Sequence, residues 1–207
     1  MSVYVNFVSD FPTRCQEILA DYEPRARFLG RDVTHMLAIA AVGLNIPFER
    51  LREDASHVSK DRESYQVAKT QLSDLRRRRF LGSDLWGPQP GSWRYGEIPN
   101  GEGTVEDWKH TCSPVCLTGG RVTGNGGPFT NDTVLRSLRN ALAHGNIFTP
   151  GTEEIEDVVF LSKINFRKEP YRVLVVSPAD FREFLKRWFI FIRRIRMPVG
   201  LIEAAVA

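Results

Sequence analysis

The residues best suited to chemistry lie in the segment 131–144, where Arg139, Asn140 and His144 follow one another closely. Apolar residues recur in this segment at the spacing of an amphipathic helix. With about 100° of rotation per residue, they fall in one arc that faces a core; they are Val134, Leu135, Leu138, Ala141 and Leu142. Arg136 joins the other three polar residues on the opposite side. The sequence therefore predicts a helix with one buried face and one polar face. Asn131 or Asp132 is expected to cap its start, and Gly145 follows its end.

The polar face carries residue types that suit the cleavage of RNA without a metal. When a 2′-hydroxyl attacks the adjacent phosphorus, one group takes its proton and another protonates the leaving oxygen, and histidine serves either step. The guanidinium of Arg139 would face the negative charge of the transition state. Asn140 and His144 are one turn apart, so the asparagine is placed to orient the histidine or a phosphate oxygen. The alternative is an ordinary solvated helix face, where arginine and asparagine are common.

The stretch Leu138–Asn146, LRNALAHGN, resembles the signature of the HEPN superfamily. That signature is an arginine followed after a short spacer by a histidine, with a polar residue often directly after the arginine. The resemblance implies a small helical bundle and, in many members, a metal-independent ribonuclease of toxin–antitoxin, CRISPR-associated or phage-defence systems. Carried over residue by residue, Arg139 and His144 would be catalytic and Asn140 auxiliary. We expect Arg136 to hold the RNA backbone as a substrate-binding residue.

Helices are expected throughout the first third of the chain. Apolar spacing predicts one helix from Phe11 up to a break at Pro24. A second helix, capped by Asp32, is apolar nearly all round and should be central and buried. Pro47 either ends this helix or begins the next one. A polar helix is then predicted over Val58–Phe80.

Strands are expected only near the end of the chain. Two of them are predicted at Ile155–Ile164 and Tyr171–Val176, joined into a β-hairpin by a turn at Arg167–Pro170. Ser177 then caps a last helix with Pro178 at its first position. The expected fold is therefore mainly α: a HEPN-like helical bundle with a β-hairpin before the C-terminal helix and an irregular insert.

The insert is the segment 82–128, which is rich in Gly, Pro, Trp and Ser and shows little periodicity. We interpret it as an insertion, ending at about residue 130, in a single domain that spans residues 1–207. It is too irregular to build the core, so it is expected to shape access to the site. Its aromatic residues either stack on bases or pin the insert onto the bundle; they are Trp86, Trp93, Tyr95 and Trp108.

Composition narrows the class of protein further. The longest apolar run is too short to span a bilayer, and the N-terminus lacks the features of a signal peptide, so a cytoplasmic protein without membrane contact is expected. His110, Cys112 and Cys116 lack a Cys-x-x-Cys pattern and a fourth ligand, so neither a metal nor another cofactor is expected. Basic residues gather at Arg76–Arg79 and over 182–196, either as RNA contacts or as solvated helix faces.

Partners follow from the motif and from helix geometry. RNA is the expected substrate. Arg139 and His144 diverge by about 140° on their helix, so one copy surrounds a phosphate poorly, and a homodimer through the motif helix is expected. A nucleotidyltransferase antitoxin is a further partner that the resemblance implies. Two alternatives stay open: a non-catalytic HEPN module that binds RNA or protein, and an enzyme acting on a small nucleotide in the glycine-rich insert.

Overall fold

The computed structural model describes residues 7–50, 62–80, 83–86, 91–98, 103–114, 130–163 and 171–195. Its elements are, in order, α1 (Phe7–Phe28), α2 (Asp32–Arg50), α3 (Arg62–Arg77), the 3-10 helix η1 (Asp84–Trp86), β1 (Arg94–Ile98), α4 (Val105–Thr111), β2 (Ser113–Pro114), α5 (Asn131–His144), β3 (Ile147–Phe148), β4 (Val158–Lys163), β5 (Tyr171–Val176) and α6 (Pro178–Arg194). The fold is mainly helical, as predicted. None of these helices is both long and apolar enough to cross a membrane.

The strands form one antiparallel sheet in the order β2-β1-β5-β4-β3. The predicted hairpin lies at its centre, where β4 and β5 pair along their whole length with Val158 opposite Val176. The first of these strands begins at Val158 instead of Ile155, and the turn expected at Arg167–Pro170 falls outside the described residues. The hairpin is thus confirmed, but it is part of a wider sheet.

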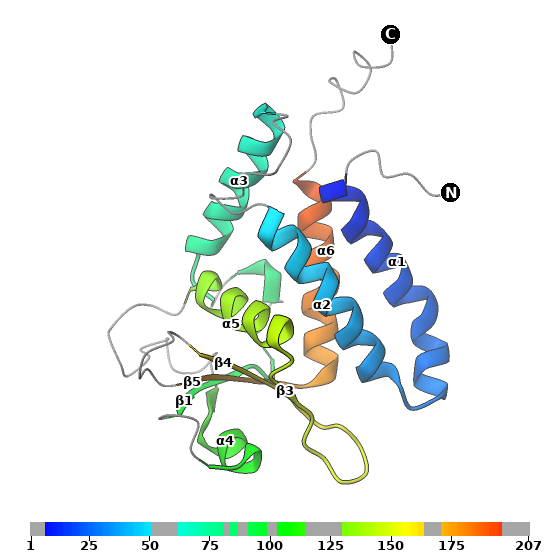
Figure 1. Cartoon of the computed structure of the whole chain (residues 1–207), viewed down its shortest axis with the longest axis vertical. Helices are drawn as coiled ribbons and strands as arrows, with labels where there is room; N and C mark the ends of the chain where they lie inside the picture. The colour runs from blue at the N-terminus through cyan, green and yellow to red at the C-terminus, as the bar shows by residue number, and fades with distance from the viewer. Residues whose placement is uncertain are drawn as a thin grey trace.

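The sheet is covered on both faces because successive residues of a strand point to opposite sides. Val158 and Phe160 of β4 join the main core under the helices. Val159 and Leu161 face a second apolar cluster that includes Trp108 of α4. Figure 1 shows α5 on one side of the sheet and α4 on the other. The motif helix therefore rests on a rigid platform.

The segment 82–128 contributes to this platform and to the core, so the expectation that it is too irregular to build the core is wrong. β1 pairs with β5 inside the sheet. Trp86 and Trp93 are buried in the main core, where the indole of Trp86 stacks on Phe184 with ring centroids 4.5 Å apart. Two roles were weighed for the aromatic residues, and the structure supports packing for Trp86, Trp93 and Trp108, since all three are buried. Isolated aromatic residues in a Gly- and Pro-rich stretch produce no hydrophobic periodicity. The sequence pattern therefore did not reveal that this segment contributes to the core.

Two prolines do not end helices as expected. α1 continues through Pro24 to Phe28, and α2 continues through Pro47 to Arg50. A proline inside a helix removes one hydrogen bond and crowds the preceding turn, but α1 packs along both α2 and α6, and this contact offsets the loss. α2 is central, although Val42 on its outer side is exposed, so it is not buried all round.

Candidate catalytic site on helix α5

Helix α5 is set by capping interactions at both ends. The side chain of Thr130 accepts a hydrogen bond from the backbone N–H of Thr133, so Thr130 is the N-cap, instead of either of the two residues that follow it, which the sequence favoured. Gly145 ends the helix in the left-handed region with φ 68° and donates its N–H to the Ala141 carbonyl. Only glycine adopts this conformation without strain. Interactions between residues close in the sequence thus fix where the helix that carries the motif begins and ends.

Asn131, the first residue of α5, is fully buried and anchors the helix. Its Nδ2 donates to the Leu75 carbonyl at 2.9 Å and to Ser83 Oγ at 3.0 Å, and its Oδ1 accepts from Trp86 Nε1 at 2.7 Å. Its backbone N–H also donates to the Arg78 carbonyl. These bonds tie the start of α5 to α3 and η1. In the sequence, a polar residue at the start of a helix suggested a cap. Only the hydrogen-bond partners around Asn131 in the structure show that it anchors the helix instead.

Arg139 is held against α2. Its guanidinium carbon lies 5.8 Å from the ring centroid of Phe48, which is 3% exposed, and its Nη1 donates to Asn140 Oδ1 at 2.9 Å. The asparagine was expected beside His144, but here its oxygen accepts from the arginine. Asn140 and Phe48 therefore give the guanidinium a defined position.

His144 and Arg136 occupy the open part of the polar face. His144 is exposed at the end of α5. The side chain of Arg136 is 58% exposed, and its Nε lies 2.9 Å from Asp132 Oδ2 one turn earlier. The apolar arc predicted from the sequence is buried as expected. Arg139 and His144 lie about 140° apart on the helix, so they sit near opposite edges of this face.

Arg76 and Phe48 complete the site, and the sequence alone did not identify either of them as a site residue. Arg76, from α3, places its guanidinium carbon 5.3 Å from the centroid of the same Phe48 ring, and its Nε bonds Asp132 Oδ1. Asp132 therefore holds both Arg76 and Arg136. We call Arg76, Arg136 and Arg139 the arginine cluster. In the sequence, the only indication for Arg76 was that it belongs to the basic run at residues 76–79, and nothing pointed to Phe48.

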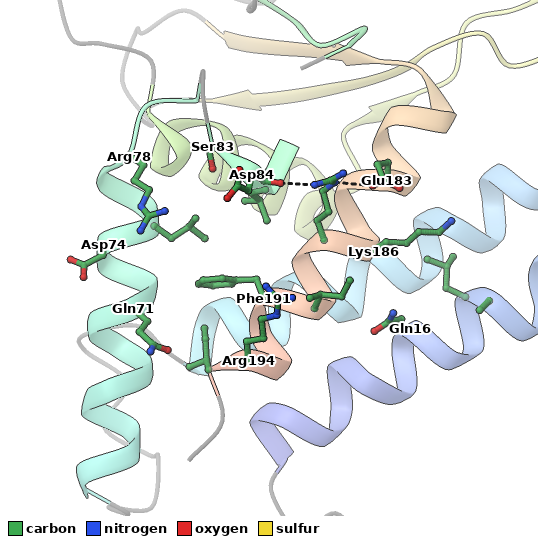
Figure 2. A pocket seen from close by; sticks show the side chains of 17 residues that line it. Gln16, Gln71, Asp74, Arg78, Ser83, Asp84, Glu183, Lys186, Phe191 and Arg194 are labelled. Carbon is green, nitrogen blue, oxygen red and sulfur yellow. Dashed lines mark hydrogen bonds and ion pairs between the residues drawn. The ribbon is translucent and has the colours of Figure 1, made fainter. Parts of the chain in front are cut away.

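A groove of about 740 Å³ lies between α3 and α6 and is a separate feature (Figure 2). Its described lining comes from α1, α3, η1 and α6, so α3 is the element that it shares with the arginine cluster. Arg78 and Arg194 face the groove together with the carboxylates Asp74 and Asp84. Figure 2 shows Phe191 pointing from α6 toward α3. The groove thus mixes both charges.

The zinc ligands considered in the sequence are not assembled in the described part of the chain. Cys112 is buried, its thiol donates to the Trp108 carbonyl, and burial raises its pKa to about 12. A thiol with so high a pKa stays protonated near neutral pH. His110 is exposed and lies 3.5 Å from Glu106, while Cys116 is outside the described residues. Among those residues no group of three His, Cys, Asp or Glu side chains is placed to hold a metal.

Comparison with known families extends the resemblance far beyond the motif. The sequence model of the family HEPN pEK499 p136 matches residues 1–198. In the same comparisons no curated protein and no solved structure matches the chain. The matched region includes α5 and every other described element, and family membership supports a nuclease or RNA-related role at the level of the family. Because the match covers well over half of the chain, this protein belongs to the HEPN family.

Proposed function

We propose that this protein is a metal-independent endoribonuclease that acts as a toxin or phage-defence effector. The observation that carries the proposal is the fixed position of Arg139 on the same helix face as an accessible His144. Phe48 and Asn140 hold the guanidinium, and the histidine is exposed at the helix end. A preorganised cation and an accessible proton-transfer group are what cleavage by 2′-hydroxyl attack needs.

The reaction is an internal displacement at phosphorus. A histidine takes the proton of the 2′-hydroxyl, the oxygen forms a bond to the adjacent phosphorus, and the bond from phosphorus to the 5′-oxygen breaks. That leaving oxygen takes up a proton from a protonated histidine, so one proton is taken and one is given, and the products are a 2′,3′-cyclic phosphate and a 5′-hydroxyl. Arg139 faces the phosphate oxygens, where negative charge grows in the transition state. No water enters the bond-breaking step, and none of these transfers calls for a metal.

The direct test is cleavage of total RNA by the pure protein in excess chelator, with His144→Ala beside it. We expect the wild type to produce cyclic-phosphate ends and His144→Ala to be inactive. The matched control is His110→Ala, since His110 is also exposed but lies on α4. A strict need for magnesium, or products with a 5′-phosphate, would contradict the mechanism.

We further propose that two copies build one site across a two-fold axis. One copy offers Arg139 and His144 near opposite edges of a helix face, whereas two facing α5 helices would surround a phosphate with two arginines and two histidines. Light scattering at micromolar concentration should show a dimer. Mixing Arg139→Ala with His144→Ala protein should restore part of the activity, because a mixed dimer keeps one intact arginine and one intact histidine. A fully active monomer would contradict this arrangement.

The biological role has its own test. Induced expression in a bacterial host should slow growth, and His144→Ala should not. If both proteins slow growth equally, the protein acts through binding, which is the role of a non-catalytic HEPN module. A nucleotidyltransferase antitoxin, if it is the partner, should relieve the inhibition on co-expression.

A further inference from the structure

Two arginines from different helices share one aromatic ring beside the candidate site. The guanidinium carbons of Arg76 and Arg139 lie 5.3 Å and 5.8 Å from the centroid of Phe48. The ring attracts each of the two cations, and this attraction offsets part of the repulsion between like charges. Asp132 adds a carboxylate beside Arg76. Guanidiniums from α3 and α5 thus meet at one ring beside the candidate site.

Arg76 keeps donors available for a ligand. A guanidinium has five N–H donors, and in the described part of the chain the hydrogen bond of Arg76 to Asp132 uses Nε. Its side chain is 20% exposed, so part of it is accessible to solvent. Phe48 is nearly inaccessible, which excludes it as a platform for stacking a base. The ring therefore serves to position the two cations.

We propose that Arg76 forms a second phosphate subsite, which binds the phosphodiester next to the scissile one in single-stranded RNA. This rests on the proposed function, in which Arg139 faces the scissile phosphate. A guanidinium recognises phosphate oxygens through paired N–H donors, and a nucleic-acid strand is a ligand that presents phosphates at adjacent positions. Phe48 and Asp132 are positioning residues, because they act on the RNA only through the arginines.

The competing role for Arg76 is purely structural, as an ion pair that ties α3 to α5. Arg77, the next residue of α3, is exposed and supplies a matched control with the same change of charge. Generic attraction between a basic surface and RNA would make Arg76→Gln and Arg77→Gln equivalent. If Arg76 forms a defined subsite, the Arg76→Gln protein should bind RNA more weakly than the Arg77→Gln protein.

The experiment measures binding of a fluorescein-labelled single-stranded RNA oligonucleotide by anisotropy over a range of salt concentrations. All variants carry His144→Ala, so that the RNA stays intact. Each phosphate contact contributes about 0.7 to the slope of log affinity against log salt for single strands. We expect Arg76→Gln to lower that slope by about 0.7 and to weaken binding several-fold, with Arg77→Gln close to the parent.

A second pair of variants changes no charge. Phe48→Leu removes the ring and should lower the salt slope, whereas Phe48→Tyr keeps it and should not. Thermal unfolding of each variant shows whether it is folded at the temperature of the measurement. In the active background, Arg76→Gln should raise KM for RNA and leave kcat nearly unchanged, as expected for a residue that binds without taking part in the reaction.

The outcomes separate the subsite from the proposed function. If the wild type does not cleave RNA but Arg76→Gln lowers the slope below that of Arg77→Gln, the nuclease proposal fails and the subsite stands. If cleavage is found but the two variants bind alike, the subsite is overturned. A His144→Ala protein that binds no RNA overturns it as well.

Discussion

Two groups of arginines, one on α6 and one around the motif helix α5, are used differently. On α6, Arg182 is 11% exposed and lies between Glu23 at 3.4 Å and Asp32 at 3.2 Å, so it joins α6 to α1 and α2. Arg187 on the same helix pairs with Glu183 and donates to the Asp84 carbonyl. Two members of the arginine cluster, Arg76 and Arg136, share one carboxylate, that of Asp132.

The difference lies in the neighbouring acids, because both groups have the same residue type. Where carboxylates from several helices surround one guanidinium, the charge is neutralised and the residue holds elements together. Where two guanidiniums share one carboxylate, as Arg76 and Arg136 share Asp132, that carboxylate does not neutralise both charges, and the surface can attract a polyanion. A run of basic residues in a sequence therefore does not tell a structural ion pair from a binding surface.

The largest effect should come from the motif residues themselves. Arg139→Ala or His144→Ala should lower the rate of RNA cleavage by a factor of about 10² to 10⁴ and leave the protein folded, since His144 is exposed and Arg139 lies at the edge of the core. Cleavage of labelled RNA, with circular dichroism as the folding control, measures this. Wild-type rates in both variants would place the chemistry elsewhere.

Removing Arg182 should act on stability instead. Arg182→Met keeps much of the apolar side chain but removes the cation beside Asp32 and one of the two cations beside Glu23, which also pairs with Arg27, so we expect a loss of about 3 kcal/mol in the free energy of unfolding. Urea denaturation measures it, and Lys186→Met, at an exposed position of the same helix, is the control. If folded Arg182→Met protein cleaves RNA poorly while its stability is unchanged, the contrast between the two groups is wrong.

The anchor of α5 comes next in size. Asn131→Ala leaves the Trp86 indole N–H without its acceptor and removes one of the two donors to the Leu75 carbonyl, so a loss of about 2 kcal/mol in unfolding free energy is expected. Cleavage should fall as well, because the start of α5 positions the arginine cluster. A stability equal to that of the wild type would show that the buried hydrogen bonds do not fix the helix.

The carboxylate shared by the cluster should matter less. Asp132 is partly exposed, and water screens its ion pairs, so Asp132→Asn should lower the unfolding free energy by about 1 kcal/mol or less. Urea denaturation alongside Arg182→Met gives the comparison directly. A loss as large as that of Arg182→Met would mean that the cluster is a structural network like the one on α6.

The smallest effect concerns two buried thiols and depends on pH. Burial raises the pKa of Cys15 to about 11 and that of Cys112 to about 12. At pH 8 the reactive thiolate is therefore scarcer in the folded protein than in the unfolded chain. Alkylation by iodoacetamide, followed by mass spectrometry, should be slow at both residues until denaturant is added. Rapid labelling of Cys15 in native protein would show that the packing of α1 on α6 opens readily.

The sequence by itself determined the elements that depend on neighbours along the chain. The two faces of α5 follow from apolar spacing, and its end follows from Gly145. The α6 helix begins as predicted, with Ser177 as N-cap and Pro178 in the first turn, and the central hairpin was recognised from its two apolar runs. Capping, periodicity and turn chemistry are short-range, so a linear pattern carries them.

The tertiary structure decided what depends on residues far apart in the sequence. β1 finds its place because β5 offers it a free edge, and helical packing carries α1 and α2 through their prolines. The contacts of Arg76 and Arg139 with Phe48 join three helices. No local pattern encodes these contacts, because each depends on where the core and the sheet bring separate segments together. The motif was therefore visible in the sequence. The Phe48 ring, which positions Arg76 and Arg139, and the pairing of the Asp132 carboxylate with Arg76 emerged only from the fold.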